Sequence, residues 1–488
     1  MPIDLLITGG TVVDGRGQVG YQADIAIGGD EIVRVGPARP AHAKRLIDAS
    51  GLVVAPGFVD IHSHSDYHLF LNPQADSSLR QGVTTEIGGN CGYSAAPIFG
   101  PAREERRKVY KESFDFDPHW SSLAEYFQAL ENVEPAVNFG MLAGHNTVRS
   151  SLLGDGRVRA NPSDLESMAQ TVREGISQGA FGLSTGLIYP PACFSDQQEL
   201  VYLARECAAQ GAILTIHLRN EGPDLLAALK EALAVAQASQ VRLQISHLKT
   251  SGEENWHKLD EAFQMIEKAR AEGLAVSCDR YPYTASNTGL QALLPNWALA
   301  GDPQERLARL KEAGTRVKII GELDDRHADK SYWESIAIAE VVSTANKSLE
   351  GLTLAKIASL RGLNGSEALV QLLLEEELKV TCLIHSMSEA NLRRILQKPY
   401  VMVGSDSGCR ARTGPLARGR VHPRIFGTFA RVLGEYVREK AILDLPAAIR
   451  KMTWDPCRVL NIQDRGLIKE GYKADLVVFD PDQIKDTA

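Results

Sequence analysis

The sequence predicts an α/β fold: a (β/α)8 TIM barrel with a small β-sandwich domain built from both termini and an insertion between strands seven and eight. Three observations favour this fold. Short strand-like segments separated by turn signals fill the first 56 residues and return near the C-terminus. Between these two regions, apolar strand-like segments alternate with helical stretches, which is typical of βα units around a parallel sheet. Histidine, cysteine and aspartate residues recur at the ends of these apolar segments.

The length and composition are those of a globular protein with more than one hydrophobic core. The chain has 488 residues, of which 44% are hydrophobic and 23% charged. The formal net charge of −8 argues against a nucleic-acid partner. No signal segment and no apolar run approaching about 18 residues is present, so we expect neither secretion nor a membrane span. The seven cysteines are scattered without a C-x-x-C pair, which indicates a reducing, cytoplasmic location.

Residues 1–56 are predicted to form the first half of the β-sandwich domain. Strand-like segments such as 4–8 and 23–27 are separated by glycine-containing turns. About fifty residues of short strands are not expected to be stable alone. Residues 455–488 contain two further strand-like segments around a Glu-Gly turn, and we expect them to complete the same domain.

Residues 57–454 are predicted to form the barrel. Its eight expected strands are 57–62, 84–87, 137–143, 181–184, 213–217, 243–247, 275–279 and 400–404. A doubly wound open sheet is the alternative, but no Gly-x-Gly-x-x-Gly follows the first strand. The interval of about 288–398 is too long for a plain crossover, so we expect an inserted subdomain over the barrel mouth. This subdomain is either a lid that excludes water or a passive insertion.

Metal-binding residue types stand at the ends of several predicted strands. His62 and His64 end the first strand, and both imidazoles face the same way because side chains alternate along a strand. The other strand-end residues are Cys91, His145, His217, His247 and Asp406. The C-terminal ends of barrel strands converge on one site. One such histidine is usually structural, but the whole set predicts a metal site.

This order of residues resembles the amidohydrolase superfamily, as does the ending from Glu470 to Asp480. Many members bridge two metals with a lysine or glutamate on the fourth strand, but residues 182–186 contain neither. Cys91, in Gly-Gly-Asn-Cys-Gly-Tyr-Ser, instead resembles the cysteine ligand of the D-aminoacylases, which are N-acyl-D-amino-acid deacylases. The segments that resemble the same subgroup are 182–190, 246–249, 279–283 and 422–429.

The resemblance implies a hydrolase of linear amide bonds, which cleaves N-acyl-D-amino acids with the help of zinc. Cys91, His217 and His247 are expected to form the tight zinc site, because a thiolate and two imidazoles leave a fourth position for water or substrate. A second, weaker position would share Cys91 with His62, His64 and Asp406. Asp406 is also expected to be the catalytic residue that transfers the proton from water to the departing amine.

The resemblance also implies a set of substrate-binding residues. Lys249, with Tyr281 or Tyr283, is expected to bind the α-carboxylate, and Arg424 is a further candidate. Tyr189 offers another hydroxyl at the barrel mouth. Residues 286–299 contain no arginine or lysine, which predicts hydrophobic D-amino acids such as leucine, methionine or phenylalanine rather than D-glutamate or D-aspartate.

Several alternatives remain at this point. A related reaction is deacylation of acidic N-acyl-D-amino acids, cleavage of dipeptides ending in a D-residue, or ring opening as in hydantoinases and dihydroorotases. The absence of a lysine on strand four argues against ring opening. An alternative of a different class is a catalytically silent barrel that acts as a scaffold, which the intact residue set disfavours. Individual residues also have plain alternatives: Cys91 as a buried hydrophobe, Lys249 as a surface lysine, and Cys409 as either an inert thiol or a further site residue.

Overall fold

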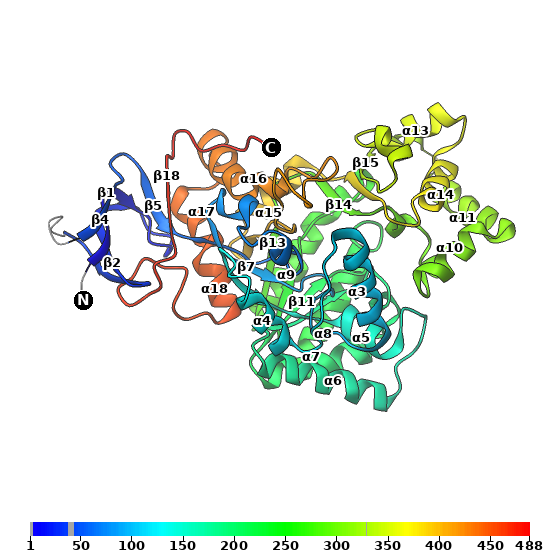
Figure 1. Cartoon of the computed structure of the whole chain (residues 1–488), viewed down its shortest axis with the longest axis horizontal. Coiled ribbons are helices and arrows are strands. Elements are labelled where there is room, and N and C mark those ends of the chain that lie inside the picture. Colours follow the sequence, from blue (N-terminus) through cyan, green and yellow to red (C-terminus); the bar gives the residue numbers. More distant parts are fainter. Residues whose placement is uncertain (1–2, 38–42, 328) are drawn as a thin grey trace.

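The computed structural model describes residues 3–37, 43–327 and 329–488, and it confirms the predicted fold class. Parallel strands form the centre of the molecule, with helices around them (Figure 1). These strands are β6 (Phe58–Asp60), β7 (Val83–Gly88), β8 (Asn138–Met141), β9 (Ala143–Gly144), β10 (Gly182–Gly186), β11 (Ile213–His217), β12 (Arg242–Ile245), β13 (Val276–Arg280) and β17 (Val401–Val403). Nearly all their side chains are buried, as expected for a parallel sheet covered on both faces.

The parallel strands close into a barrel through two irregular junctions. The third predicted strand is divided, so that β8 pairs with β7 while β9 pairs with β10. The first and last strands meet just beyond their ends, where the Asp406 amide donates to the His62 carbonyl at 2.8 Å and the His64 amide to the Ser407 carbonyl at 3.0 Å. This second junction brings His62, His64 and Asp406 together.

Amphipathic helices cover the outside of the barrel. Helix α6 (Pro162–Ser177) begins with a capping box, in which the Asn161 side chain accepts from the amide of Asp164, and it buries one apolar face. The other helices of the barrel region are α1 (His68–Leu71), α2 (Asp76–Leu79), α3 (Gly100–Phe114), α4 (Leu123–Glu131), α5 (His145–Leu153), α7 (Gln197–Ala209), α8 (Leu225–Ser239), α9 (Leu259–Ala271), α15 (Glu389–Gln397), α16 (Arg424–Arg431), α17 (Leu445–Met452) and α18 (Trp454–Leu460). A π-helical segment, Val432–Glu439, continues α16.

A six-stranded sheet joins the two ends of the chain. The sheet contains β1 (Ile3–Val12), β2 (Tyr21–Gly28), β3 (Glu31–Val35), β4 (Ala43–Asp48), β5 (Val53–Pro56) and β18 (Leu476–Phe479). The C-terminal strand β18 pairs antiparallel with β5, and the Ile32 amide donates to the Tyr472 carbonyl at 2.8 Å. The last strand therefore extends the N-terminal sheet, which lies at one end of the molecule in Figure 1.

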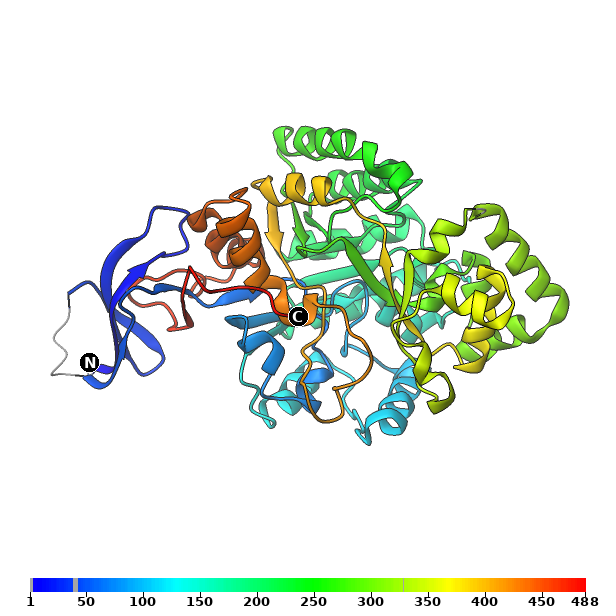
Figure 2. The same cartoon turned by 90° about the horizontal axis from the view of Figure 1, so that it is seen from above.

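The chain between β13 and α15 forms a separate lobe at the opposite end of the molecule (Figure 2). Three antiparallel strands, β14 (Ala285–Gly289), β15 (Ile336–Glu340) and β16 (Thr381–His385), form its sheet. Its helices are α10 (Pro303–Lys311), α11 (Ala313–Arg326), α12 (Lys330–Glu334), α13 (Leu354–Arg361) and α14 (Gly365–Glu375). The lobe has its own hydrophobic core, which includes Ile319, Ile336 and Leu369.

Two negative findings apply to the residues that the structure describes. No helix there has the length and apolar composition needed to cross a bilayer. All seven cysteines are free thiols, in agreement with the expectation from their spacing.

Three phenylalanines join the barrel to the terminal sheet. Phe58 of β6 is fully buried, and its ring centroid lies 5.7 Å from that of Phe429 in α16 and 6.5 Å from that of Phe479 in β18. Stacked and tilted aromatic pairs of this kind add to the free energy of ordinary apolar burial. The junction therefore couples the terminal sheet to the first strand of the barrel.

We expect Phe58→Ala to lower the free energy of unfolding by about 3–5 kcal/mol, because the cavity it leaves is closed by two other rings. Denaturant titration followed by fluorescence and circular dichroism measures the change. Leu360→Ala, at a position in α13 that is 61% exposed, is the control and should change the stability by less than about 0.5 kcal/mol. Equal losses in the two variants would contradict a stabilising role for the junction.

Candidate active site

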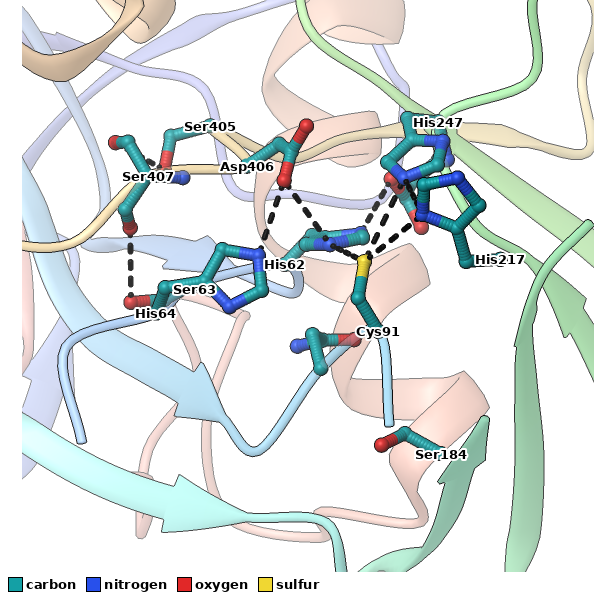
Figure 3. Close-up of polar contacts among 12 residues, drawn as sticks. His62, Ser63, His64, Cys91, Ser184, His217, His247, Ser405, Asp406 and Ser407 are labelled. Carbon is teal, nitrogen blue, oxygen red and sulfur yellow. Dashed lines mark hydrogen bonds and ion pairs between the residues drawn. The ribbon is translucent and has the colours of Figure 1, made fainter. Parts of the chain in front are cut away.

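Six of the strand-end residues meet at the C-terminal mouth of the barrel. Their ligand atoms fall into two groups, one of Cys91, His217 and His247 and one of His62, His64, Cys91 and Asp406. Within each group all ligand atoms lie within 4.8 Å of one another. Figure 3 shows the sulfur of Cys91, which belongs to both groups, with contacts to the rings of His62, His217 and His247, whereas the His64 ring contacts Asp406.

The first group is compact and buried. Cys91 Sγ lies 3.4 Å from His217 Nδ1 and 3.5 Å from His247 Nε2, and these two nitrogens are 3.0 Å apart. All three side chains are nearly inaccessible to solvent. A soft thiolate and two imidazoles on one side of a small volume are a donor set that suits a transition metal.

The second group shares the cysteine and adds a carboxylate. Cys91 Sγ lies 3.3 Å from His62 Nε2, and Asp406 Oδ1 lies 3.0 Å from His64 Nε2 and 3.4 Å from His62 Nε2. His64 is the most exposed of these side chains, at 32%. This group is therefore the more open of the two.

The backbone is strained at three of these residues. Cys91, His247 and Asp406 have positive φ angles of 53°, 35° and 51°. Such angles are uncommon for residues other than glycine and cost of order 1–3 kcal/mol each, so the surrounding structure must hold them. At Cys91, the next residue is Gly92, where an added Cβ would lie 1.8 Å from Asn146 Oδ1. The cysteine loop is therefore packed too closely to accept a side chain there.

A set of buried carboxylates supports the ligands from behind. Asp279 Oδ1 lies 3.0 Å from His62 Nδ1 and accepts the backbone amide of His247 at 2.9 Å. Asp66 accepts the amide of Gly89 at 2.9 Å and so holds the loop that carries Cys91. Partners of this kind fix the ring orientation and tautomer of a metal-binding histidine.

Glu221 is a further supporting residue that the sequence analysis did not identify. Its Oε1 lies 3.0 Å from His247 Nδ1, and its Oε2 lies 3.7 Å from His217 Nε2. A proton on Nδ1 donated to Glu221 leaves Nε2 of His247 free to bind a metal. The only signal in the sequence is a carboxylate four residues after the strand-end His217, which is too common a pattern to be decisive.

The electrostatics of the site favour the anionic forms of Cys91 and Asp406. Burial acts to raise the pKa of the Cys91 thiol, but the charges of His62 and His247 outweigh it and hold the pKa well below its ordinary value. Burial also acts to raise the pKa of Asp406, and Arg424 and His247 outweigh it in the same way. Metal ligands must be deprotonated, so both side chains are prepared for that role.

A cavity of about 1530 Å³ opens above these residues. Its walls include Cys91, His217, His247 and Asp406 from the barrel, and Thr288 and Leu293 from the inserted lobe. The lobe therefore forms part of the wall of the active-site cavity, next to the candidate metal ligands.

Comparison with known proteins places this geometry in a family. The model of the "Amidohydrolase family" matches residues 45–488. The chain belongs to the amidohydrolase family. An N-acyl-D-glutamate deacylase of Alcaligenes xylosoxydans xylosoxydans is 35% identical, covering 100% of this chain and 89% of that protein. A D-aminoacylase of the same organism is 33% identical, covering 100% of this chain and 90% of that protein.

A solved structure shows the same overall similarity. The N-acyl-D-glutamate deacylase of Bordetella bronchiseptica, crystallised with zinc and a phosphonate inhibitor, superposes on this amidohydrolase with a TM-score of 0.84. It is 32% identical, and the match covers 100% of this chain and 92% of that chain. The resemblance to the N-acyl-D-amino-acid deacylases that was noted in the sequence is therefore confirmed.

The predicted substrate-binding residues of this amidohydrolase fall into two classes. Lys249, Tyr189, Tyr281 and Arg424 line the cavity. Lys249 is only 3% exposed, which excludes a surface lysine, and its Nζ lies 2.5 Å from Glu221 Oε1 and 2.6 Å from His247 Nδ1. Arg424 donates from Nη1 to Asp406 Oδ2 at 2.7 Å, so it contacts the candidate catalytic carboxylate directly.

Tyr283 is the predicted substrate-binding residue that the structure does not bring to the cavity. Its hydroxyl donates to Asp486 Oδ2 at 2.8 Å, and it is not part of the cavity wall. The Tyr283 amide donates to the Tyr281 carbonyl at 3.0 Å, which closes a tight turn over Pro282. Because of this turn, the two tyrosines do not share the face that two residues along a strand would share.

His145 and Cys409 also lie outside the two ligand groups. His145 begins helix α5, where its Nδ1 lies 2.8 Å from Thr185 Oγ1 and its Nε2 lies 2.8 Å from Glu199 Oε1. Glu199 also accepts from the buried Arg149. Cys409 packs in an apolar cluster with Tyr126 and contributes no atom to the ligand groups. Both residues therefore have structural surroundings.

We expect Cys91→Ala to abolish binding at both metal positions, because Cys91 is common to the two groups. The affinity for zinc should fall by more than the roughly 10–100-fold typical of losing an outer partner of a ligand. Titration of metal-free protein against a zinc indicator measures the change. Cys409→Ala, a buried cysteine outside the groups, is the matched control and should bind zinc as the unmodified protein does. Retention of tight binding in Cys91→Ala would contradict the assignment.

Proposed function

We propose that this protein hydrolyses the amide bond of N-acyl-D-amino acids, with zinc held by Cys91, His217 and His247. The observation that carries the proposal is the compact thiolate and imidazole group beside Asp406, at the base of a cavity that also contains Lys249 and Tyr281. The similarity to N-acyl-D-glutamate deacylase and D-aminoacylase over the full length of the chain supports the reaction class. The products are a carboxylic acid and a free D-amino acid.

The donor spacing fits zinc. Around a tetrahedral zinc ion with ordinary bond lengths, the distance from sulfur to nitrogen is about 3.5 Å and that between nitrogens about 3.3 Å. The corresponding distances here are 3.4, 3.5 and 3.0 Å. Bound there, zinc supplies Lewis-acid polarisation of the substrate carbonyl and lowers the pKa of water. His62, His64 and Asp406 offer a second position, which is weaker because it is more open.

Asp406 is the proposed proton carrier. Its carboxylate is ionised at neutral pH, faces the cavity, and is held on one side by Arg424 and on the other by His64. It takes the proton of the attacking water and transfers it to the departing amine nitrogen. Arg424 acts by holding Asp406 Oδ2, which leaves Oδ1 directed toward the ligand groups.

The α-carboxylate of the substrate is assigned to Lys249 and Tyr281. Lys249 carries three donors, of which Glu221 takes one, so donors remain for the substrate. The Tyr281 hydroxyl is buried in the cavity wall and has no hydrogen-bond partner among the described residues. Guanidinium groups of Arg280 and Arg424 lie 4.2 Å and 4.7 Å from its ring centroid. This cationic surrounding suits a carboxylate.

The side chain of the D-amino acid is assigned to the part of the wall formed by residues 286–293 of the inserted lobe. Residues 286–293 that line the cavity carry no charge. Tyr189, whose hydroxyl lies 3.2 Å from Thr288 Oγ1, joins this wall to the barrel. Burial of an unpaired carboxylate against such a wall is costly, so hydrophobic D-amino acids are favoured. The substrate is a small molecule, and a reducing cytoplasmic location is in keeping with the free cysteines.

Asp406→Asn should reduce kcat by about 10²–10⁴-fold while most of the zinc is retained, because the amide keeps the shape but cannot accept the proton. Steady-state kinetics on N-acetyl-D-leucine, with zinc content measured on the same sample, makes the comparison. Asp48→Asn, in the remote strand β4, serves as the control and should leave kcat unchanged. Turnover near the unmodified level in Asp406→Asn would refute its role.

Substrate preference gives a second test. The value of kcat/KM for N-acetyl-D-leucine should exceed that for N-acetyl-D-glutamate by about tenfold or more, which corresponds to about 1.4 kcal/mol. The L-enantiomers are measured in parallel and should be poor substrates. A preference for N-acetyl-D-glutamate would instead assign the protein to the acidic class of its relatives. Cleavage of no N-acyl-D-amino acid by the zinc-loaded protein would overturn the proposed function.

A further inference from the structure

One arginine in the wall of the active-site cavity differs from the other arginines around it. Arg106, on helix α3, lines the cavity, and it makes no hydrogen bond or ion pair with any residue that the structure describes. Its neighbours on the helix are engaged: Arg107 donates to Asp117 at 2.8 Å, and Arg103 donates to the Trp120 carbonyl at 2.9 Å. The nearby carboxylate of Asp155 is paired with Arg306 at 3.1 Å. Glu105, the preceding residue, also lines the cavity and acts on Arg106 electrostatically, but it forms no ion pair with it. Arg106 is therefore a positive charge left available to a ligand.

Two tyrosines beside Arg106 have hydroxyl groups that form no hydrogen bond within the part of the chain that the structure describes. Tyr67 and Tyr110 stack with ring centroids 4.1 Å apart, and both line the cavity. The Tyr67 side chain is 7% exposed, and its buried hydroxyl has no hydrogen-bond partner among the described residues. The guanidinium carbon of Arg106 lies 6.0 Å from the Tyr67 ring centroid. A buried hydroxyl without a partner is costly unless something binds it.

The charge of Arg106 acts on both hydroxyls. Burial raises the pKa of Tyr110 to about 12, and Arg106 is the strongest influence in the opposite direction. The pKa of Tyr67 is raised for the same reason and opposed by the same arginine. Both hydroxyls are therefore protonated donors at neutral pH, grouped around one cation. A guanidinium and hydroxyl donors together match the acceptors of a carboxylate.

This cluster lies on the opposite side of the metal ligands from the proposed α-carboxylate site. Tyr67 follows His64 by three residues, and α3 follows the second barrel strand, β7. Lys249 and Tyr281 follow the sixth and seventh strands, β12 and β13. In an eight-stranded barrel the second and sixth strands face each other across the axis. A substrate with its α-carboxylate on Lys249 and its amide at the ligands would direct its acyl group toward Arg106.

We propose that Arg106, Tyr67 and Tyr110 form a subsite for a second carboxylate, carried at the far end of the acyl group. The preferred substrates are then N-acyl-D-amino acids whose acyl group derives from a dicarboxylic acid, such as an N-succinyl or N-glutaryl group. Water adds its hydroxyl to the acyl carbon, the C–N bond breaks, and the amine gains the proton, which yields a dicarboxylic acid and a D-amino acid. This inference rests on the proposed function and specifies its acyl half.

The test compares acids with their uncharged ω-amides. N-succinyl-, N-glutaryl- and N-adipoyl-D-leucine are each assayed beside the ω-amide of the same length. In the unmodified protein, kcat/KM for the acid should exceed that for the amide by about tenfold or more at the best length, as a charge-assisted hydrogen bond provides. Arg106→Gln should reduce this acid-to-amide ratio to near one. Arg107→Gln, one position along the same helix, is the matched control and should keep the ratio.

The remaining outcomes separate the possible failures. An acid-to-amide ratio near one at every length in the unmodified protein, or a ratio unchanged in Arg106→Gln, overturns the inference. If Arg106→Gln instead lowers the preference for N-acetyl-D-glutamate over N-acetyl-D-glutamine, the second carboxylate belongs to the amino-acid side chain, and the acyl assignment is wrong. Failure to cleave any N-acyl-D-amino acid refutes the proposed function itself. Calorimetric titration with glutarate, compared between the unmodified protein and Arg106→Gln, still tests the subsite in that case, and equal binding overturns it.

Discussion

The central constraint in this structure is the Cys91 thiolate, which lies within 3.5 Å of imidazole nitrogens from three histidines. A single sulfur between two ligand groups requires a backbone that brings it there, and the chain provides one at the cost of a positive φ angle. Within this loop, Gly92 lies so close to Asn146 that no side chain fits at its position. The positions of the histidines and of Asp406 are then set by the ends of the strands that surround this loop.

Buried charged side chains hold the candidate metal ligands in place. Three of these side chains each contact a candidate ligand: Asp279 contacts His62, Glu221 contacts His247, and Arg424 contacts Asp406. These contacts fix the orientation of the rings and of the carboxylate. Isolated charges could not be buried at this depth. Because each is paired, the site combines a thiolate, a carboxylate and several imidazoles in a small volume, which is the composition that a metal-dependent hydrolase needs.

The inserted lobe and helix α3 both line the cavity above this centre. Residues 286–293 of the lobe supply an uncharged part of the wall, whereas α3 supplies Arg106 and Tyr110, and Tyr110 stacks on Tyr67. The barrel strands supply Lys249 and Tyr281 on the remaining side. Three parts of the chain thus contribute three chemically different surfaces to one cavity. In the proposed reaction, the acyl group and the side chain of the substrate would contact different surfaces of this cavity.

The sequence by itself determined the barrel, the terminal sheet and the residue types at the strand ends, because strand periodicity and the polarity of parallel strands act locally and repeat. It could therefore indicate that Cys91, His217 and His247 would approach one another. Only the tertiary structure decided that a turn over Pro282 directs Tyr283 away from the cavity, that Glu199 and Thr185 engage His145, and that Glu221 lies behind two ligands. These outcomes depend on which distant groups become neighbours, and no local pattern in the chain encodes that.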